Sequence, residues 1–473
     1  MGIRLGNIFI LLALFGTFIV SGSCALEPKI DKRLSKTLER VGYANILVSM
    51  KDGTRDILNE LAGKSFSSRT ERSQALYNAL TARATHSQSH TLNWLEEPAI
   101  LKSFNYGKFY SLWITNQIAI EFASRELIET LALMNEISRI QEDEIEELVH
   151  PVDSHSTNAE SIQVVNQWGV TEIRAPQVWA SDTRGAGITI ASIDTGVRPT
   201  HVILSANYVN DTHSWYDPYD ESEVAHDRNG HGTHTVGTVL GRNGFGVAPE
   251  AKWIACKGLS DTGSGTTTNL IRCGQFLVCP TTFNGTDPDC SKTPHVVCNS
   301  WGGASGRTVY DEMIEAWHVA GIIPVVSAGN SGPRCSSVGT PGDRDVISVG
   351  STTSDNTRSS FSSVGPTSFN TMKPDVSAPG STIMSADHRF DNTYSIKSGT
   401  SMAAPHVVGA VALLLSKNPD LTYVQIKHLL QSYADRDLDP EGYNCDFISD
   451  NAFPNHHLGY GRINIGRSMA ALN

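Results

Sequence analysis

The sequence lacks the features that mark several classes of protein. No stretch is rich in lysine and arginine, and the formal net charge is −12. Proteins that bind nucleic acid or an anionic membrane surface carry clustered basic side chains. We therefore expect no nucleic-acid partner, and the acidic balance indicates only that the chain should be soluble.

Two signatures of functional sites are also missing. The sequence contains no Cys-x-x-Cys pair, the spacing from which structural zinc sites are commonly built, so we expect no zinc site. The Gly-x-Ser-x-Gly turn of α/β-hydrolases is absent around Ser401, because Ala403 stands where its second glycine would be.

The N-terminus predicts export. Arg4 precedes an apolar run from Ile8 to Val20, and the small residues Ser23-Cys24-Ala25 follow. This order is typical of a secretory signal peptide, so we expect residues 1–25 to be removed and the protein to be extracellular. The run is short for a membrane anchor, the alternative interpretation. After signal removal we expect no membrane association.

Cysteine usage agrees with export. Cys24 would leave with the signal, and seven cysteines would remain. An odd number in an exported protein predicts up to three disulfides and one spare thiol, with the pairing left open. Cys256 ends the strand-like run Trp253–Cys256, and we expect it to be the buried free thiol.

Ser401 has the surroundings of a nucleophile. It follows Gly399-Thr400 and opens a stretch, Met402 to Leu415, in which nearly every residue is apolar or small. Such a stretch predicts a buried helix. Ser401 would lie at its N-terminus, where backbone donors and the helix dipole favour developing negative charge.

A base and an acid occur upstream in compact motifs. Asp194-Thr195-Gly196 follows the apolar run Gly187–Ile193, which predicts a buried parallel strand with the carboxylate at its C-terminal end. His231 lies within Asn229-Gly230-His231-Gly232-Thr233-His234, with glycine on both sides. A serine nucleophile needs such a base and an acid that orients it. We expect His234 and His406 to pack or cap helices.

The region between the signal and these motifs predicts a separate small domain, residues 26–150. Strands are expected at Ala44–Met50, Tyr110–Ile114, Gln117–Phe122 and Ile137–Ile140, with helices starting after Ser68 and Ser124. Strand–helix–strand–strand–helix–strand is the split βαβ, ferredoxin-like pattern. The acidic run Glu142–Glu147 is interpreted as a solvated connector.

From about Val165 to Ala471 the chain resembles the subtilisin-like serine proteases, and most closely their bacillopeptidase F branch. The motifs around Asp194, His231 and Ser401 carry the resemblance in the family's order. It implies an α/β catalytic domain, residues 151–473, with a parallel sheet and helices on both faces. The domain before it resembles the family's inhibitory propeptide, which implies a self-processing zymogen cut between Val149 and Gln163.

The resemblance also assigns roles. Ser401 would attack the peptide carbonyl, His231 would transfer the proton, Asp194 would orient His231, and Asn330 would stabilise the oxyanion. Two segments would pair with the substrate backbone, Gly263-Ser264-Gly265 and Ser300-Trp301-Gly302. Ala328, Gly329 and Gly339 would line the pocket for the P1 residue, the one on the amino side of the cleaved bond. These positions carry no charge, so we expect broad specificity with apolar or aromatic P1 residues.

The remaining expectations concern ligands and alternatives. The segment Gly241–Gly246, where the family often binds calcium, is short and lacks carboxylates, so no cofactor is expected and calcium dependence is in doubt. Asn210 and Asn284 lie in N-glycan sequons. The partners would be protein and peptide substrates and the chain's own propeptide, with a monomeric enzyme. A non-catalytic binding protein and an esterase or transacylase are the competing hypotheses.

Overall fold

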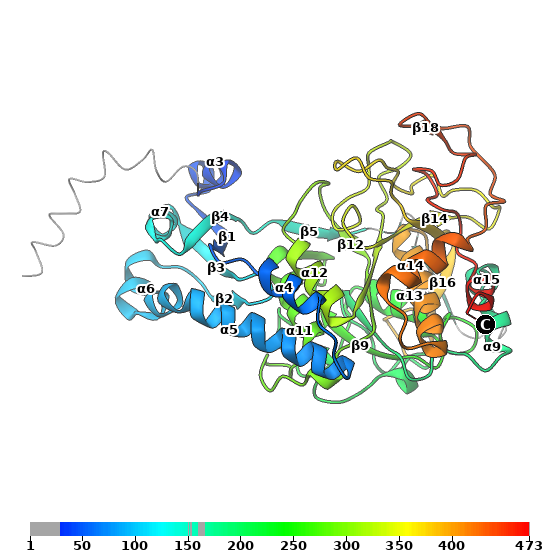
Figure 1. Cartoon of the computed structure of the whole chain (residues 1–473), viewed down its shortest axis with the longest axis horizontal. Coiled ribbons are helices and arrows are strands. Elements are labelled where there is room, and N and C mark those ends of the chain that lie inside the picture. The colour runs from blue at the N-terminus through cyan, green and yellow to red at the C-terminus, as the bar shows by residue number, and fades with distance from the viewer. Residues whose placement is uncertain (1–28, 150, 152–153, 159–165, 473) are drawn as a thin grey trace, which may run out of the picture. The chain divides into compact units, whose positions relative to one another are not determined.

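The computed structural model describes residues 29–149, 151, 154–158 and 166–472 (Figure 1). These residues form two units, one from residues 29–56 and 79–144 and the other from residues 57–78 and 145–472. The expected signal peptide, residues 1–25, lies outside the described residues, as does most of the expected processing region.

The first unit is built on a four-stranded antiparallel sheet with the strand order β2-β3-β1-β4. Its strands are β1 (Tyr43–Met50), β2 (Phe109–Leu112), β3 (Gln117–Ser124) and β4 (Ile137–Glu142). The order places the first and last strands side by side, as the split βαβ pattern requires. The predicted ferredoxin-like arrangement is confirmed.

Helices precede and connect these strands. They are α3 (Lys32–Val41), α4 (Arg55–Ala62), α5 (Arg69–Glu96), α6 (Pro98–Phe104) and α7 (Arg125–Leu133), with residues of α4 and α5 divided between the two units. Ser124 caps α7 as predicted, because its Oγ accepts a hydrogen bond from the Leu127 N–H at 3.3 Å. Ile46 and Val48 of β1 pack with Leu127 and Leu131 of α7 in one apolar core.

The second unit contains a seven-stranded parallel sheet with the order β15-β14-β13-β11-β7-β9-β8. The strands are β7 (Thr189–Asp194), β8 (Trp215–Tyr216), β9 (Lys252–Lys257), β11 (Val296–Asn299), β13 (Ile323–Ser327), β14 (Ile347–Thr352) and β15 (Val376–Pro379). The central strands are buried along almost their whole length, as the apolar runs predicted.

Helices lie on both faces of this sheet, so the predicted α/β class is confirmed. The larger helices are α10 (His231–Leu240), α11 (Thr267–Val278), α12 (Asp311–Ala320), α13 (Thr400–Lys417) and α14 (Tyr423–Ser432). The shorter ones are α8 (Trp168–Glu172), α9 (Ala175–Trp179), α15 (Ile465–Ala470) and the 3₁₀ turns η2 (Ser205–Asn207) and η3 (Cys290–Lys292). α10 packs against α13, and α11 packs against α12.

The long helix α13, orange in Figure 1, is the centre of the core. It is long and apolar enough to cross a membrane, but 89% of that stretch is buried inside the fold. It contacts β11, β13, β14 and β15. α13 is therefore the buried core helix that the sequence predicted.

Smaller sheets complete the second unit. One has the order β10-β5-β12, one the order β16-β17-β6, and one pairs β18 with β19. Their strands are β5 (Ile145–Leu148), β10 (Ser264–Thr266), β12 (Trp301–Gly302), β6 (Ser154–Asn158), β16 (Ile383–Ala386), β17 (Thr393–Lys397), β18 (Asn444–Cys445) and β19 (Ile448–Ser449).

Six cysteines of the second unit form three disulfides. The prediction that Cys256 is the free thiol is wrong. The pairs are Cys256–Cys273, Cys279–Cys290 and Cys335–Cys445. Cys298 is the free cysteine among the described residues, and it is buried. Cys256 ends β9 beside α11, which carries Cys273, with 5.6 Å between their Cα atoms. Cys298 lies in the centre of the sheet opposite Ser192 and Val325, where no second cysteine is in register.

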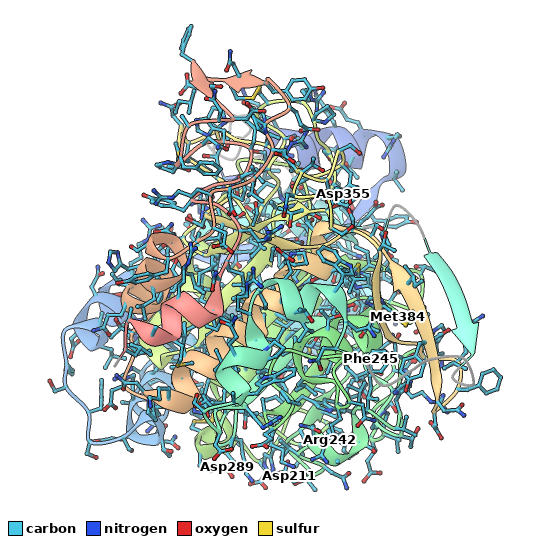
Figure 2. All side chains as sticks on the ribbon, turned by 90° about the vertical axis from the view of Figure 1, so that its right-hand side faces the viewer. Asp211, Arg242, Phe245, Asp289, Asp355 and Met384 are labelled. Carbon is cyan, nitrogen blue, oxygen red and sulfur yellow. A yellow bond between two sulfur atoms is a disulfide. The ribbon has the colours of Figure 1, made fainter. Side chains whose placement is uncertain are left out.

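The short segment Gly241–Gly246, which follows α10, packs against the fold through an aromatic side chain. Phe245 is 4% exposed and stacks on Tyr394 with 4.5 Å between the ring centroids. Figure 2 labels Phe245 beside Arg242, whose Nε donates to Asn207 Oδ1 at 3.0 Å. This turn is thus closed by packing and by a side-chain hydrogen bond.

Candidate active site

Three elements of the parallel sheet layer position the predicted triad. Asp194 is the last residue of β7, His231 is the first residue of α10, and Ser401 is the second residue of α13. Open α/β sheets place their sites at the C-terminal ends of strands, where helices begin. Gly230 before His231 has φ 94°, a conformation that a side chain would strain, and a Cβ there would lie 2.1 Å from His388 Nδ1.

Asp194 holds the His231 ring. His231 Nδ1 lies 2.8 Å from Asp194 Oδ1 and 3.0 Å from Oδ2, and both residues are 1% exposed. A second donor, the Thr195 N–H, reaches Oδ1 at 2.7 Å. A carboxylate only accepts, so Nδ1 carries the proton and Nε2 keeps its lone pair. Nε2 is buried and has no hydrogen-bond partner among the described residues.

The Ser401 hydroxyl faces a peptide. Its Oγ donates to the Val149 carbonyl oxygen at 2.9 Å and lies 3.3 Å from the Ser300 carbonyl oxygen. The structure therefore joins His231 to Asp194 by hydrogen bonds but directs the Ser401 hydroxyl to Val149. A chain segment occupies the position where a substrate carbonyl would meet the nucleophile.

Asn330 is oriented toward the same place. Its Oδ1 accepts hydrogen bonds from the Thr400 N–H at 2.9 Å and from the Thr400 hydroxyl at 3.0 Å. A backbone N–H can only donate, so the carbonyl end of the Asn330 side chain must face Thr400. The Nδ2 donor is left to face the cavity, beside the first turn of α13, where backbone N–H groups lack intrahelical acceptors.

The segment Ile145–Val149 lies as a strand between the two predicted peptide-pairing segments. β5 pairs antiparallel with β10 on one side and with β12 on the other. The Leu148 N–H donates to the Gly263 carbonyl at 2.8 Å, and the Val149 N–H to the Ser300 carbonyl at 3.4 Å. The backbone of β5 is therefore held on both sides by main-chain hydrogen bonds, as the backbone of a bound peptide is in other proteins.

A cavity of about 420 Å³ adjoins Val149. The predicted P1-pocket residues Ala328, Gly329 and Gly339 all line it, together with Asn330. None of these side chains carries a charge, and three of the four positions are glycine or alanine. The cavity could therefore accept an uncharged side chain of variable size.

The interpretation of the acidic run as a solvated connector is wrong for Glu146. This side chain is fully buried and accepts a hydrogen bond from the Tyr310 hydroxyl at 2.9 Å, and it forms an ion pair with Arg307. Sequence analysis missed Arg307 and Tyr310 entirely. They lie more than 160 positions from Glu146, and neither belongs to a recognisable motif.

The other histidines of the motifs are buried in the core. His406 Nδ1 lies 2.8 Å from the Met402 carbonyl, and burial lowers the pKa of His406 to about 4. His234 Nε2 donates to the Ile383 and Ser395 carbonyls, each at 3.1 Å, and burial lowers its pKa well below the usual value. Both rings are neutral and packed, as the sequence analysis expected.

Comparison with known proteins identifies the fold family. The profile of the subtilase family matches residues 185–461, more than half of the chain. The chain belongs to the subtilase family. The predicted resemblance is confirmed, and this subtilase is a serine peptidase by class.

Individual relatives agree. Bacillopeptidase F of Bacillus subtilis (strain 168) is 29% identical over 95% of this chain, and the chain spans 33% of that relative's length. Subtilisin DY of Bacillus licheniformis is 36% identical over 56% of this chain and 90% of its own length. Serine protease AprX of Bacillus subtilis (strain 168) is 34% identical over 57% of this chain and 67% of its own length.

Within the described part of this subtilase, one cluster of side chains has the composition of a cation site. Asp217, Asp220 and His226 offer ligand atoms within 4.8 Å of one another. Asp217 Oδ1 already accepts two backbone N–H groups, and Asp220 is paired with Arg228. Calcium prefers six to eight oxygen ligands. Two carboxylates and an imidazole do not meet this need, and we assign no chemical step to a metal here.

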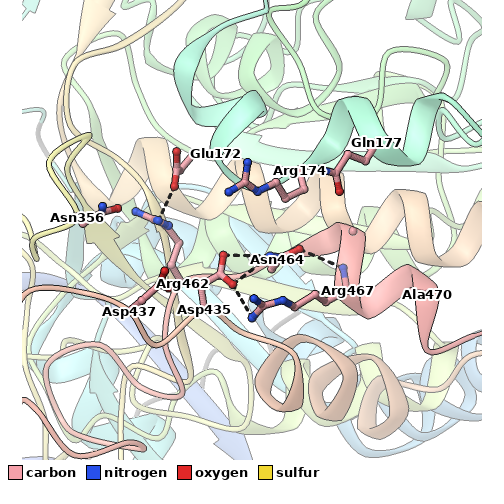
Figure 3. A pocket seen from close by; sticks show the side chains of 11 residues that line it. Glu172, Arg174, Gln177, Asn356, Asp435, Asp437, Arg462, Asn464, Arg467 and Ala470 are labelled. Carbon is pink, nitrogen blue, oxygen red and sulfur yellow. Dashed lines mark hydrogen bonds and ion pairs between the residues drawn. The ribbon is translucent and has the colours of Figure 1, made fainter.

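Figure 3 shows a second cavity of the subtilase, about 480 Å³, whose lining contains none of the predicted site residues. Four of its charged side chains form two ion pairs: Arg462 Nη2 with Glu172, and Arg467 Nη1 with Asp435 at 2.8 Å. Asn464 also donates to both oxygens of Asp435. The cavity contains no nucleophile with an adjacent base, so it is not the candidate active site.

Proposed function

We propose that this chain is the precursor of a secreted serine endopeptidase that cuts itself after Val149. The observation that carries the proposal is the hydrogen bond of 2.9 Å between Ser401 Oγ and the Val149 carbonyl oxygen. It supports the proposal because the carbonyl of an extended segment lies within hydrogen-bond distance of the hydroxyl that would attack it. The four residues of β5, paired on both sides, and Val149 after them are then held as the residues of a substrate or product before the bond would be held.

The side chains divide the chemistry among them. Ser401 Oγ attacks the Val149 carbonyl carbon while His231 Nε2 takes the hydroxyl proton, which requires the hydroxyl to rotate toward the imidazole. Asp194 keeps the proton of the neutral ring on Nδ1 and stabilises the imidazolium that forms. The resulting oxyanion accepts hydrogen bonds from Asn330 Nδ2 and from the Ser401 N–H.

Collapse of the tetrahedral intermediate breaks the C–N bond. His231 gives its proton to the amine of residue 150, which leaves, and an acyl-enzyme joins Ser401 to Val149. A water, deprotonated by the same imidazole, then hydrolyses the ester and restores the serine. The pairing of backbone groups with β10 and β12 supports a peptide substrate over a simple ester.

The proposal includes a zymogen stage. Residues 145–149 fill the cleft after cleavage as well as before it, so the released propeptide would inhibit the enzyme until it is degraded. Apart from Glu147 of the segment that precedes Val149, the cavity beside Val149 is lined by uncharged residues, which supports a broad preference for apolar or aromatic P1 residues. N-glycans at Asn210 and Asn284 are part of the proposal, and both side chains are exposed.

Labelling with a fluorophosphonate tests the nucleophile. The activated protein should form one adduct, on the peptide that contains Ser401, and labelling should abolish cleavage of a quenched peptide substrate. Ser416→Ala is a matched control, because Ser416 lies near the far end of the same helix and is bonded to the Ala186 carbonyl. An adduct on another serine, or peptide cleavage that survives full labelling, would overturn the proposal.

A further inference from the structure

Glu146 is buried within the strand that occupies the cleft. Its side chain is fully buried, whereas the side chains on either side of it, Ile145 and Glu147, are exposed. Alternate residues of a strand face opposite sides. Glu146 and Leu148 therefore face the subtilase domain, and Glu146 is the acidic side chain of the run that enters it.

A cationic pocket receives the Glu146 carboxylate. Arg307 Nη1 forms an ion pair with Glu146 Oε1, and the Tyr310 hydroxyl donates to the same oxygen at 2.9 Å. The Arg307 side chain is only 10% exposed. A charge-assisted hydrogen bond from a buried guanidinium is among the stronger polar interactions in proteins.

Contacts within the subtilase domain hold the two side chains of the pocket. Arg307 is held by its own backbone N–H, which donates to Thr340 Oγ1 at 3.1 Å, and by Nη2, which reaches Thr267 Oγ1 at 3.4 Å. Tyr310 is buried with its ring 5.3 Å from that of Trp301. These contacts belong to the subtilase domain and do not involve β5.

Glycine at position 303 makes room for the carboxylate. A Cβ on Gly303 would lie 1.8 Å from Glu146 Oε2 and 3.0 Å from Arg307 Nη1. Any side chain at this position would therefore displace the carboxylate from the guanidinium. The pocket therefore fits a carboxylate: Gly303 leaves space for it, Arg307 supplies the positive charge, and the Tyr310 hydroxyl donates a hydrogen bond.

The register of the strand fixes which substrate residue enters this pocket. Val149 lies at Ser401, so Glu146 is the fourth residue on the amino side of the cleaved bond, the P4 residue. We propose that this subtilase selects substrates with a carboxylate side chain at P4, and that Arg307, Tyr310 and Gly303 form the subsite that reads it. The inference rests on the proposed function, because it uses the same cleft and the same register.

The selectivity follows from the cost of a mismatch. A neutral amide at P4 would leave the largely buried Arg307 guanidinium without the Glu146 counter-charge, and a lysine would be repelled by it. Hydrogen bonds to charged groups contribute enough that their loss should lower kcat/KM by about tenfold or more. The exposed P3 residue, Glu147 in this chain, should matter little.

Matched peptides test the proposal on the activated, purified enzyme. The parent is an internally quenched peptide with the sequence of residues 143–154, and two variants carry Glu146→Gln or Glu147→Gln. We expect the first variant to lower kcat/KM by about tenfold or more and the second by less than about threefold. Equal cleavage of the parent and the Glu146→Gln peptide would overturn the P4 proposal and leave the proposed function standing.

An enzyme variant tests whether Arg307 is the residue that binds the P4 carboxylate. In Arg307→Gln, with rates normalised to the sites titrated by a fluorophosphonate, the ratio of kcat/KM for the parent and Glu146→Gln peptides should fall to about one. The control Arg344→Gln removes another partly buried arginine of the same domain, one paired with Asp311, and should keep the wild-type ratio. A ratio that Arg307→Gln leaves unchanged would overturn the assignment. Failure to cleave any peptide, with no fluorophosphonate adduct, would instead count against the proposed function.

Discussion

Asn330 Oδ1 accepts two hydrogen bonds from Thr400, the residue that precedes the proposed nucleophile, Ser401. The first comes from the backbone N–H and the second from the hydroxyl. Because both donors fix the oxygen end of the amide, the Nδ2 donor is aimed without any cost at the moment of reaction. The Asn330 side chain is thereby tied to the start of α13.

Replacing Asn330 with alanine should therefore slow chemistry more than binding. We expect kcat to fall about 100- to 1,000-fold with little change in KM, the loss typical of one oxyanion donor. Steady-state kinetics on a quenched peptide give both constants. Thr400→Val keeps the backbone donor and loses only the hydroxyl, so its kcat should fall far less. Comparable losses in the two variants, or a loss confined to KM, would contradict this role.

The three disulfides should differ in their contribution to stability. Cys335–Cys445 closes a loop with a sequence separation of 110 residues and Cys279–Cys290 one of 11. The entropy of loop closure predicts that removing the first lowers the free energy of unfolding by about 5 kcal/mol and removing the second by about 3 kcal/mol. Denaturant unfolding of paired Cys→Ser variants in a Ser401→Ala background avoids autolysis. The reverse order would contradict the prediction.

The thiol of Cys298 should be inert in the folded protein. Burial, together with the nearby charge of Asp194, raises its pKa to about 12, so almost no thiolate exists at about pH 8. Iodoacetamide should leave the native protein unmodified. After unfolding without a reductant, the labelled peptide should be the one that contains Cys298. Labelling at Cys256 or Cys273 would show that the pairing described here is wrong.

Buried neutral histidines should make the protein less stable in acid. The pKa of His406 is lowered to about 4 in the folded state, against about 6.5 when unfolded. Between these values the unfolded state binds a proton that the native state does not. The free energy of unfolding should thus fall as the pH drops from about 6.5 to about 4, by about 3 kcal/mol for this group.

His406→Gln isolates that contribution. Urea unfolding across this pH window, in the Ser401→Ala background, should show a shallower slope for His406→Gln than for its parent, because the carboxylates titrate equally in both. Parallel slopes would show that His406 is not held neutral by burial.

Local motifs explain why so much of the site could be predicted from sequence. Asp194, His231 and Ser401 each lie in a short stretch whose glycines and apolar residues determine a strand end or a helix start. The periodicity of apolar residues and the helix cap at Ser124 likewise predict the order of strands and helices in the first unit. Elements of this kind depend on neighbours in the sequence.

Contacts across the fold could not be predicted in this way. The pairing of Cys256 with Cys273 depends on how α11 packs beside β9, which no local pattern encodes. The burial of Glu146 depends on Arg307, far along the chain, so the charge alone suggested a solvated segment. Charged residues are usually exposed, and a buried partner is visible only in three dimensions.

The central claim is that Ser401 cuts the chain after Val149, and the N-terminus of the activated protein tests it most directly. Wild-type precursor and Ser401→Ala should be purified from a protease-deficient host, incubated alone, and analysed by intact mass and N-terminal sequencing. The account predicts that wild type gains a new N-terminus at residue 150 and that Ser401→Ala stays full length. Cleavage of Ser401→Ala at the same bond and rate would contradict it.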